Sequence, residues 1–127
     1  MAKNITRYLN EWPGVPVACS HPAVPVGGDP VRYGEMTGIA LTNEGDGGNA
    51  ATETTVWFGS GEVSVSVKGV DGGGNSAVGL GDKIYYVDAD TPVLSKKNTG
   101  RFFGFANGTV GSGATATISV FKTMNGA

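Results

Sequence analysis

The residues of this chain best suited to nucleophilic or metal chemistry are a cysteine and a histidine two positions apart. Cys19 and His21, in the segment ACSHPAVP, are the only residues of their types in the sequence. A thiol beside an imidazole is a pattern of covalent catalysis, and both side chains can bind zinc. Catalysis also requires an orienting group and an oxyanion site, and zinc requires further nitrogen or sulfur ligands. The segment reaches a turn at Pro22, so a strand leading into a turn is the favoured interpretation, and no catalytic residue or metal ligand is predicted.

Two aspartates in the segment VDADTP are the next candidates, in this case for a calcium site. Asp88 and Asp90 supply carboxylate oxygens, but the helix-loop-helix calcium site needs additional oxygens and a glutamate at its twelfth position. Aspartates before Thr-Pro are typical of a hairpin turn. A turn is therefore predicted, with weak ion binding as the alternative.

Glycine-rich and aromatic segments raise the question of nucleotide or base binding. The segment VDGGGNSAVGLGDK is similar to a phosphate-binding loop, but Lys83 leads into a predicted strand and not into a helix. The segment RFFGF could stack bases, yet little basic charge lies beside it beyond Arg101. The chain has 9 basic and 11 acidic residues, a net charge of −2, which is too balanced for a nucleic-acid partner. Neither a cofactor nor a nucleic acid is predicted to bind.

Composition places the chain among small globular β proteins. Its 127 residues suffice for one domain with a buried core, and 22 of them are glycine, which indicates many tight turns. A single cysteine excludes an internal disulfide. No apolar leader and no membrane-spanning apolar run is evident, so we expect a protein without a membrane partner that is used or assembled in a cytoplasm.

Alternation of apolar and polar residues predicts an all-β fold. In EVSVSVK the valines point to one side and the serines to the other, and TATISVF repeats the pattern. Weaker strands are expected at 15–19, 31–34, 37–42, 54–58, 83–87, 92–95 and 102–106, and the best candidate for a single helical turn is NSAVGLG at 75–81. About eight or nine short antiparallel strands of this kind form a small β-barrel or sandwich.

The two halves of the chain share an outline that predicts an internal pseudo-repeat. GDPVRY at 28–33 matches GDKIYY at 81–86, and TGIA at 37–40 matches FGFA at 103–106. Gly28 and Gly81 begin the first motif, and Gly38 and Gly104 are expected where two backbones cross too closely for a side chain. The aspartate after each first glycine is expected to cap a turn.

The first fourteen residues lie outside this repeat, so the predicted organisation is an N-terminal arm at 1–14 and a single β domain at 15–127. The arm is polar with isolated large side chains, and alone it cannot bury enough apolar area to become ordered. Docking on a neighbouring subunit or another protein would explain these side chains, and a terminus with a short strand is the alternative. The expected contact residues are Asn4, Tyr8, Leu9 and Trp12.

The order GGDPVRYGEMTGIALTNEG, a Val-rich strand, GLGDKIYYVDADTPVLS, GRFFGFANG and ATISVFK resembles the small phage capsid cement, or head decoration, proteins of the DUF2190 type over residues 14–122. The chain departs from that pattern in its longer arm and in the DGGGNSAV loop. The resemblance implies a non-enzymatic all-β virion protein. Such proteins sit on the outer surface of the phage head as homotrimers and bridge copies of the major capsid protein.

Two other functional classes remain as alternatives to a capsid cement. A tail, baseplate or carbohydrate-binding β module is the first, although Trp12 and Trp57 are far apart in the sequence and do not form an obvious sugar site. An enzyme is the second, and it is disfavoured because the sequence lacks a paired base and nucleophile.

Overall fold

The computed structural model describes residues 14–124, and this part of the chain is built from strands, with no helix. The predicted all-β class is therefore confirmed. The segment at 75–81, expected as a helical turn, instead contains the end of a strand, an isolated bridge at Val78 and a turn. The eleven strands are β1 Val15–Val17, β2 Pro30–Tyr33, β3 Met36–Ala40, β4 Thr54–Trp57, β5 Gly61–Lys68, β6 Val70–Asp71, β7 Gly74–Asn75, β8 Lys83–Tyr86, β9 Leu94–Ser95, β10 Arg101–Ala106 and β11 Thr115–Lys122.

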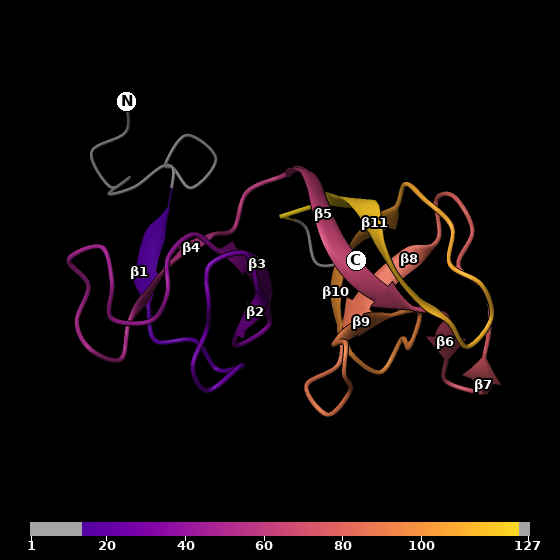
Figure 1. The fold of residues 1–127 in the computed structure, drawn as a ribbon, viewed down its shortest axis with the longest axis horizontal. Coiled ribbons are helices and arrows are strands. Elements are labelled where there is room, and N and C mark those ends of the chain that lie inside the picture. The colour runs from indigo at the N-terminus through magenta and orange to yellow at the C-terminus, as the bar shows by residue number, and fades with distance from the viewer. Residues whose placement is uncertain (1–13, 125–127) are drawn as a thin grey trace.

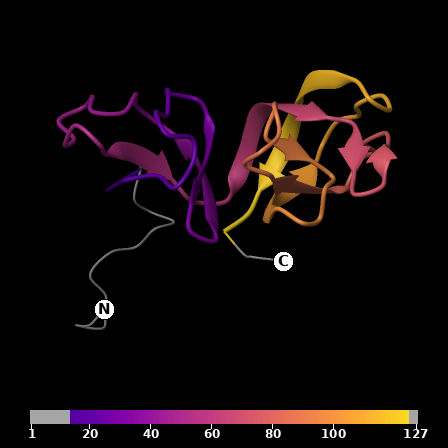
Figure 2. The same cartoon turned by 90° about the horizontal axis from the view of Figure 1, so that it is seen from below.

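The strands form two lobes that lie side by side (Figures 1 and 2). The first lobe is a four-stranded sheet of order β1-β4-β3-β2, and the second is a closed barrel of order β10-β11-β5-β9-β8. A two-stranded ribbon of β6 and β7 lies at the side of the barrel that is far from the first lobe (Figure 1). The chain crosses from one lobe to the other between β4 and β5.

The predicted repeat is confirmed by strand order and register. Reading from one edge, β2-β3-β4-β1 of the first lobe corresponds to β8-β10-β11-β5 of the second. Val31 pairs with Gly38 in the first lobe, and Ile84 pairs with Gly104 in the second. These four residues are the ones that the sequence motifs align, so the two halves repeat one structural unit.

The first glycine of each motif makes the same turn. Gly28 and Gly81 have φ angles of 95° and 81°, a region that side chains disfavour. Their N–H groups donate to the carbonyl oxygens of Ala40 and Ala106, at 2.8 and 2.7 Å. Each turn is thereby fixed to the strand that carries the second motif.

The aspartate of each motif caps this turn, as its position predicts. The carboxylate of Asp29 accepts the N–H of Val26 at 2.9 Å, and that of Asp82 accepts the N–H of Gly79 at 2.7 Å. A carboxylate that accepts a backbone N–H three residues earlier stabilises the turn locally.

The second glycine of each motif lies where two strands cross closely. A Cβ at Gly38 would approach the carbonyl oxygen of Trp57 to 2.8 Å, and a Cβ at Gly104 would collide with the carbonyl oxygen of Phe121. Only glycine fits such a crossing without moving the neighbouring strand.

The two lobes differ in how they are closed. In the second lobe β9 fills the gap in the barrel, because Leu94 pairs in parallel with Val67 of β5 and antiparallel with Tyr86 of β8. In the first lobe a single bridge between His21 and Arg32 stands in the corresponding place beside β2. The first sheet therefore stays open, while the second becomes a barrel.

Each lobe has its own apolar core. The alternation in β5 and β11 places Val65, Val67, Ile118 and Val120 inside the barrel and leaves the serines and threonines on its surface. The core of the first lobe is smaller and consists of Val15, Val31, Ala40, Val56 and Phe58. The junction between the lobes therefore depends on a separate set of contacts.

Replacing Gly104 with valine is expected to destabilise the protein by about 3 kcal/mol, because the branched side chain must displace the backbone of β11. Urea denaturation of the full chain measures this free energy of unfolding. Gly72→Val is the matched control, because only Asn98 Oδ1, at 3.9 Å, lies near a Cβ at that position. A Gly104→Val melting temperature within about 1 °C of the wild type would contradict the close crossing.

Candidate functional site

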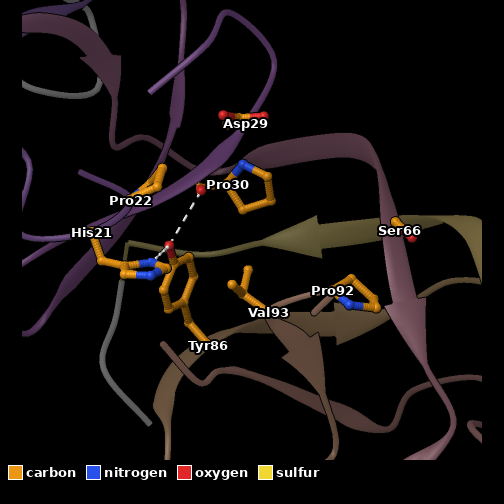
Figure 3. Close-up of a pocket in the computed structure, with 8 residues that line it drawn as sticks. All are labelled: His21, Pro22, Asp29, Pro30, Ser66, Tyr86, Pro92 and Val93. Carbon is orange, nitrogen blue, oxygen red and sulfur yellow. Dashed lines mark hydrogen bonds between the residues drawn. The ribbon is translucent and has the colours of Figure 1, made fainter. Parts of the chain in front are cut away.

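The junction between the lobes contains a half-open cavity of about 300 Å³ (Figure 3). The first lobe contributes His21, Pro22, Asp29 and Pro30, and the second contributes Ser66, Tyr86, Pro92 and Val93. The prolines and the valine make the walls mainly apolar, with a few polar groups between them. A concave apolar surface with few convergent polar groups is the usual form of a binding pocket.

The polar centre of the cavity is a contact between His21 and Tyr86 (Figure 3). Nδ1 of His21 lies 2.7 Å from the hydroxyl oxygen of Tyr86, which is also 3.5 Å from the carbonyl oxygen of Pro30. Burial raises the pKa of Tyr86 far above its ordinary value, since the side chain is only 1% exposed. The phenol therefore stays protonated, which suits a hydrogen-bond donor and not a nucleophile.

A bidentate ion pair joins the lobes beside this cavity. Nε and Nη2 of Arg32 in β2 donate to the two carboxylate oxygens of Asp88, which follows β8, at 2.9 and 2.7 Å. These hydrogen bonds lower the pKa of Asp88 below its ordinary value. The fork geometry fixes the orientation of the two strands as well as adding energy.

The second aspartate of the VDADTP segment is also paired. Asp90 forms an ion pair with Lys97 at 2.8 Å, so Asp88 and Asp90 each neutralise a different cation. Within residues 14–124, no group of three or more metal-ligating side chains is close enough to hold a metal ion. The segment forms the turn between β8 and β9, which pair antiparallel, so the predicted hairpin turn is confirmed.

A buried lysine forms a second link between the lobes. Lys122, at the end of β11, is 1% exposed, and its Nζ donates to the carbonyl oxygens of Phe58 and Gly59 at 3.2 and 3.4 Å. The Nζ atom also lies 5.9 Å from the ring centre of Trp57 and 5.7 Å from that of Phe103. Aromatic faces and carbonyl oxygens both stabilise a cation. Burial nevertheless lowers the pKa of Lys122 to about 8.

Cys19 and His21 do not form a reactive pair in this arrangement. Strand β1 ends at Val17, so the two residues do not share a strand face, and His21 turns to Tyr86. Burial, with a smaller effect from Glu44, raises the pKa of the Cys19 thiol. An activated thiol requires the opposite shift.

The remaining predicted residues fall into two groups. The expected contact residues Asn4, Tyr8, Leu9 and Trp12 lie outside the residues that the structure describes, so their role stays a prediction. The four glycines of the motifs occupy turns and close crossings within each lobe, and none of them lines the cavity.

Sequence reasoning missed the role of Arg32, Tyr86, Asp88 and Lys122 in joining the lobes. Only Lys122 carried a signal. It follows Ile118 and Val120 at the same alternating spacing, so the pattern places it on the buried face of β11. The pairing of Arg32 with Asp88 spans 56 positions and depends on how the lobes meet.

The pKa of Lys122 makes stability depend on pH. Between about pH 8 and about pH 10.5 the unfolded state binds more protons at this amine than the folded state, so the free energy of unfolding should rise with pH. We expect the wild type to gain up to about 3 kcal/mol relative to Lys122→Met across this range. Urea denaturation of both proteins at several pH values measures the difference. Cys19 and Tyr86 are present in both proteins, so their contributions to the pH dependence cancel in the difference. If the free energies of unfolding of the two proteins changed in parallel with pH, the burial of the amine would be refuted.

The Arg32–Asp88 pair should contribute measurable coupling between the lobes. A double-mutant cycle of Arg32→Met and Asp88→Asn is expected to give an interaction free energy of about 1 kcal/mol, because the pair is bidentate and partly shielded from solvent. The more exposed pair of Arg101 and Glu35, with 39% and 83% of the side chains accessible, is the matched control. Its coupling should lie near zero, and equal coupling for both pairs would contradict this assignment.

Comparison with known proteins gives no match, since no protein-family model, curated protein or solved structure is similar to this chain. No helix within residues 14–124 is long and apolar enough to cross a membrane.

Proposed function

We propose that this protein is a structural virion component, a capsid decoration protein that binds the outer surface of a phage head as a homotrimer and stabilises the lattice of the major capsid protein. The observation that carries the proposal is the doubled β unit. The Gly-Asp turns and close-crossing glycines that define this unit belong to the sequence pattern that resembles head decoration proteins. The proposed location is the virion surface, after assembly in a host cytoplasm.

The junction between the lobes supports a role as a rigid body. The hydroxyl of Thr37, which is buried in β3, donates to the carbonyl oxygen of Phe102 in β10 at 3.1 Å. Together with the Arg32–Asp88 pair and the Lys122 contacts, it connects the two lobes at several separate points. Because the two lobes are held in one relative orientation, the protein can bridge two capsid subunits and hold them at a fixed distance.

The polar residues at the junction support adhesion better than catalysis. His21, Arg32, Asp88 and Lys122 each hold the fold together through a contact that links the lobes. The phenol of Tyr86 and the thiol of Cys19 both have raised pKa values, which disfavour their reactive anions at neutral pH. A cement needs only these structural contacts and a surface that fits the shell.

Trimerisation would give such a protein sufficient affinity from modest contacts. Three linked copies bind a threefold or quasi-threefold site far more tightly than one copy, because the second and third contacts form at a high effective concentration. Each contact then needs only the ordinary interface of about 800 Å² per partner. Binding to the expanded shell in preference to the free subunits would stabilise the shell by mass action.

The test is binding of the purified full chain to expanded heads of the phage that encodes it, prepared without this protein. We expect saturable binding to the head surface in cryo-electron microscopy, and a solution mass of three times 12.9 kDa by light scattering. A variant lacking residues 2–12 should remain folded but occupy fewer sites. Unexpanded heads serve as the control. A monomer that does not bind expanded heads would refute the proposal. Binding of this monomer to a glycan array would favour a carbohydrate-binding module.

A further inference from the structure

Strand β5 has an unpaired edge beside the cavity between the lobes. Along its whole length, Gly61–Lys68, β5 pairs with β11. On its other side β9 pairs only with Val67 and Lys68, and within the described part of the chain no strand pairs with residues 61–66 on that side. The edge therefore presents an incomplete β-ladder.

The direction of the backbone groups follows from the ladder with β11. Gly69 donates its N–H to the carbonyl oxygen of Ala114 at 2.8 Å, one position beyond the end of β5. Because the direction alternates along an antiparallel strand, the N–H and C=O groups of Ser64 and Ser66 point away from β11. Both serines are exposed, and Ser66 also lines the cavity. The edge and the cavity therefore meet at Ser66.

The chemistry of this edge and of the adjoining cavity fits an extended peptide. A free strand edge offers alternating donors and acceptors to an added strand, and adjacent pockets select its side chains. Here the pocket walls of Pro22, Pro30, Pro92 and Val93 suit a large aliphatic side chain. The carboxylate of Asp29 lies at the same pocket and suits a neighbouring cation (Figure 3).

The chain itself contains a segment with these features in residues 1–13. The sequence Arg7-Tyr8-Leu9 places a cation and a large aliphatic residue two positions apart, so both would lie on one face of an extended strand. We propose that the N-terminal segment of a second copy of this chain adds to the free edge of β5, with Leu9 in the pocket and Arg7 beside Asp29.

The path of the chain favours a second copy over the same molecule. Strands β1 and β2 form opposite edges of the first sheet, so Gly14, which precedes β1, lies across the sheet from Pro30 at the pocket. Thirteen extended residues reach about 45 Å, which is sufficient to meet a neighbour.

This contact would join the subunits of the proposed homotrimer, so it rests on the proposed function. It can nevertheless be tested without phage heads. In a Cys19→Ala background, full chains carrying Asn10→Cys are mixed with full chains carrying Ser64→Cys and treated with a short bismaleimide. Asn10 adjoins Leu9 and Ser64 lies on the edge, so we expect a covalent heterodimer. Its yield should exceed that of a Leu80→Cys partner at least about tenfold, because docking concentrates the two thiols.

Leu80 is a suitable control because it is 71% exposed and does not line the pocket. Adding Leu9→Asp to the Asn10→Cys chain should abolish the heterodimer, whereas Leu80→Asp on the Ser64→Cys chain should leave the yield unchanged. Equal yields with Ser64→Cys and Leu80→Cys would overturn the inference. A cross-link that forms only within a chain carrying both cysteines would also overturn it. A trimer that binds heads without this cross-link would leave the proposed function intact while removing this subunit contact.

Discussion

The close approach of two backbones at a glycine is the constraint on which the rest of this fold depends. In the second lobe, Gly104 allows β10 to lie against β11, and the pairing of β10 with β8 shifts register between Phe102 and Gly104. Such an irregularity bends a strand and increases its twist. The bend curves the sheet, as closure into a barrel requires. Gly38 makes the same approach without a shift of register, and its sheet remains open.

One link of the junction, the contact of Lys122 with the first lobe, arises from a difference between the repeats. Trp57 and Phe121 occupy equivalent positions, since each pairs with the residue after the close-crossing glycine. The next residues, Phe58 and Lys122, are therefore equivalent too. Phe58 belongs to the core of the first lobe, whereas Lys122 reaches across and donates to the carbonyl oxygen of Phe58 itself. A repeat with phenylalanine at both positions would have two cores but would lack this polar link.

Local patterns in the sequence predict the strands and the repeat because both depend on neighbouring residues. Alternation identifies β5 and β11, and the Gly-Asp motifs align the two hairpins residue by residue. The two-residue strand β9 is different, because it exists only where β5 and β8 leave a gap for it. The cavity and the Arg32–Asp88 pair likewise depend on how two complete lobes meet, which no local pattern encodes. The contact role of Tyr8, Leu9 and Trp12 remains a prediction from composition.

The position of Lys122 in the last strand determines when its link between the lobes can form during translation. The strands of the first lobe have all been synthesised when the nascent chain reaches Phe58, but the amine that binds its carbonyl oxygens is added only after the whole barrel sequence has been translated. Domains generally fold in the order in which the ribosome delivers them. This link between the lobes can therefore form only after the last strand has been synthesised, later than the contact of Arg32 with Asp88.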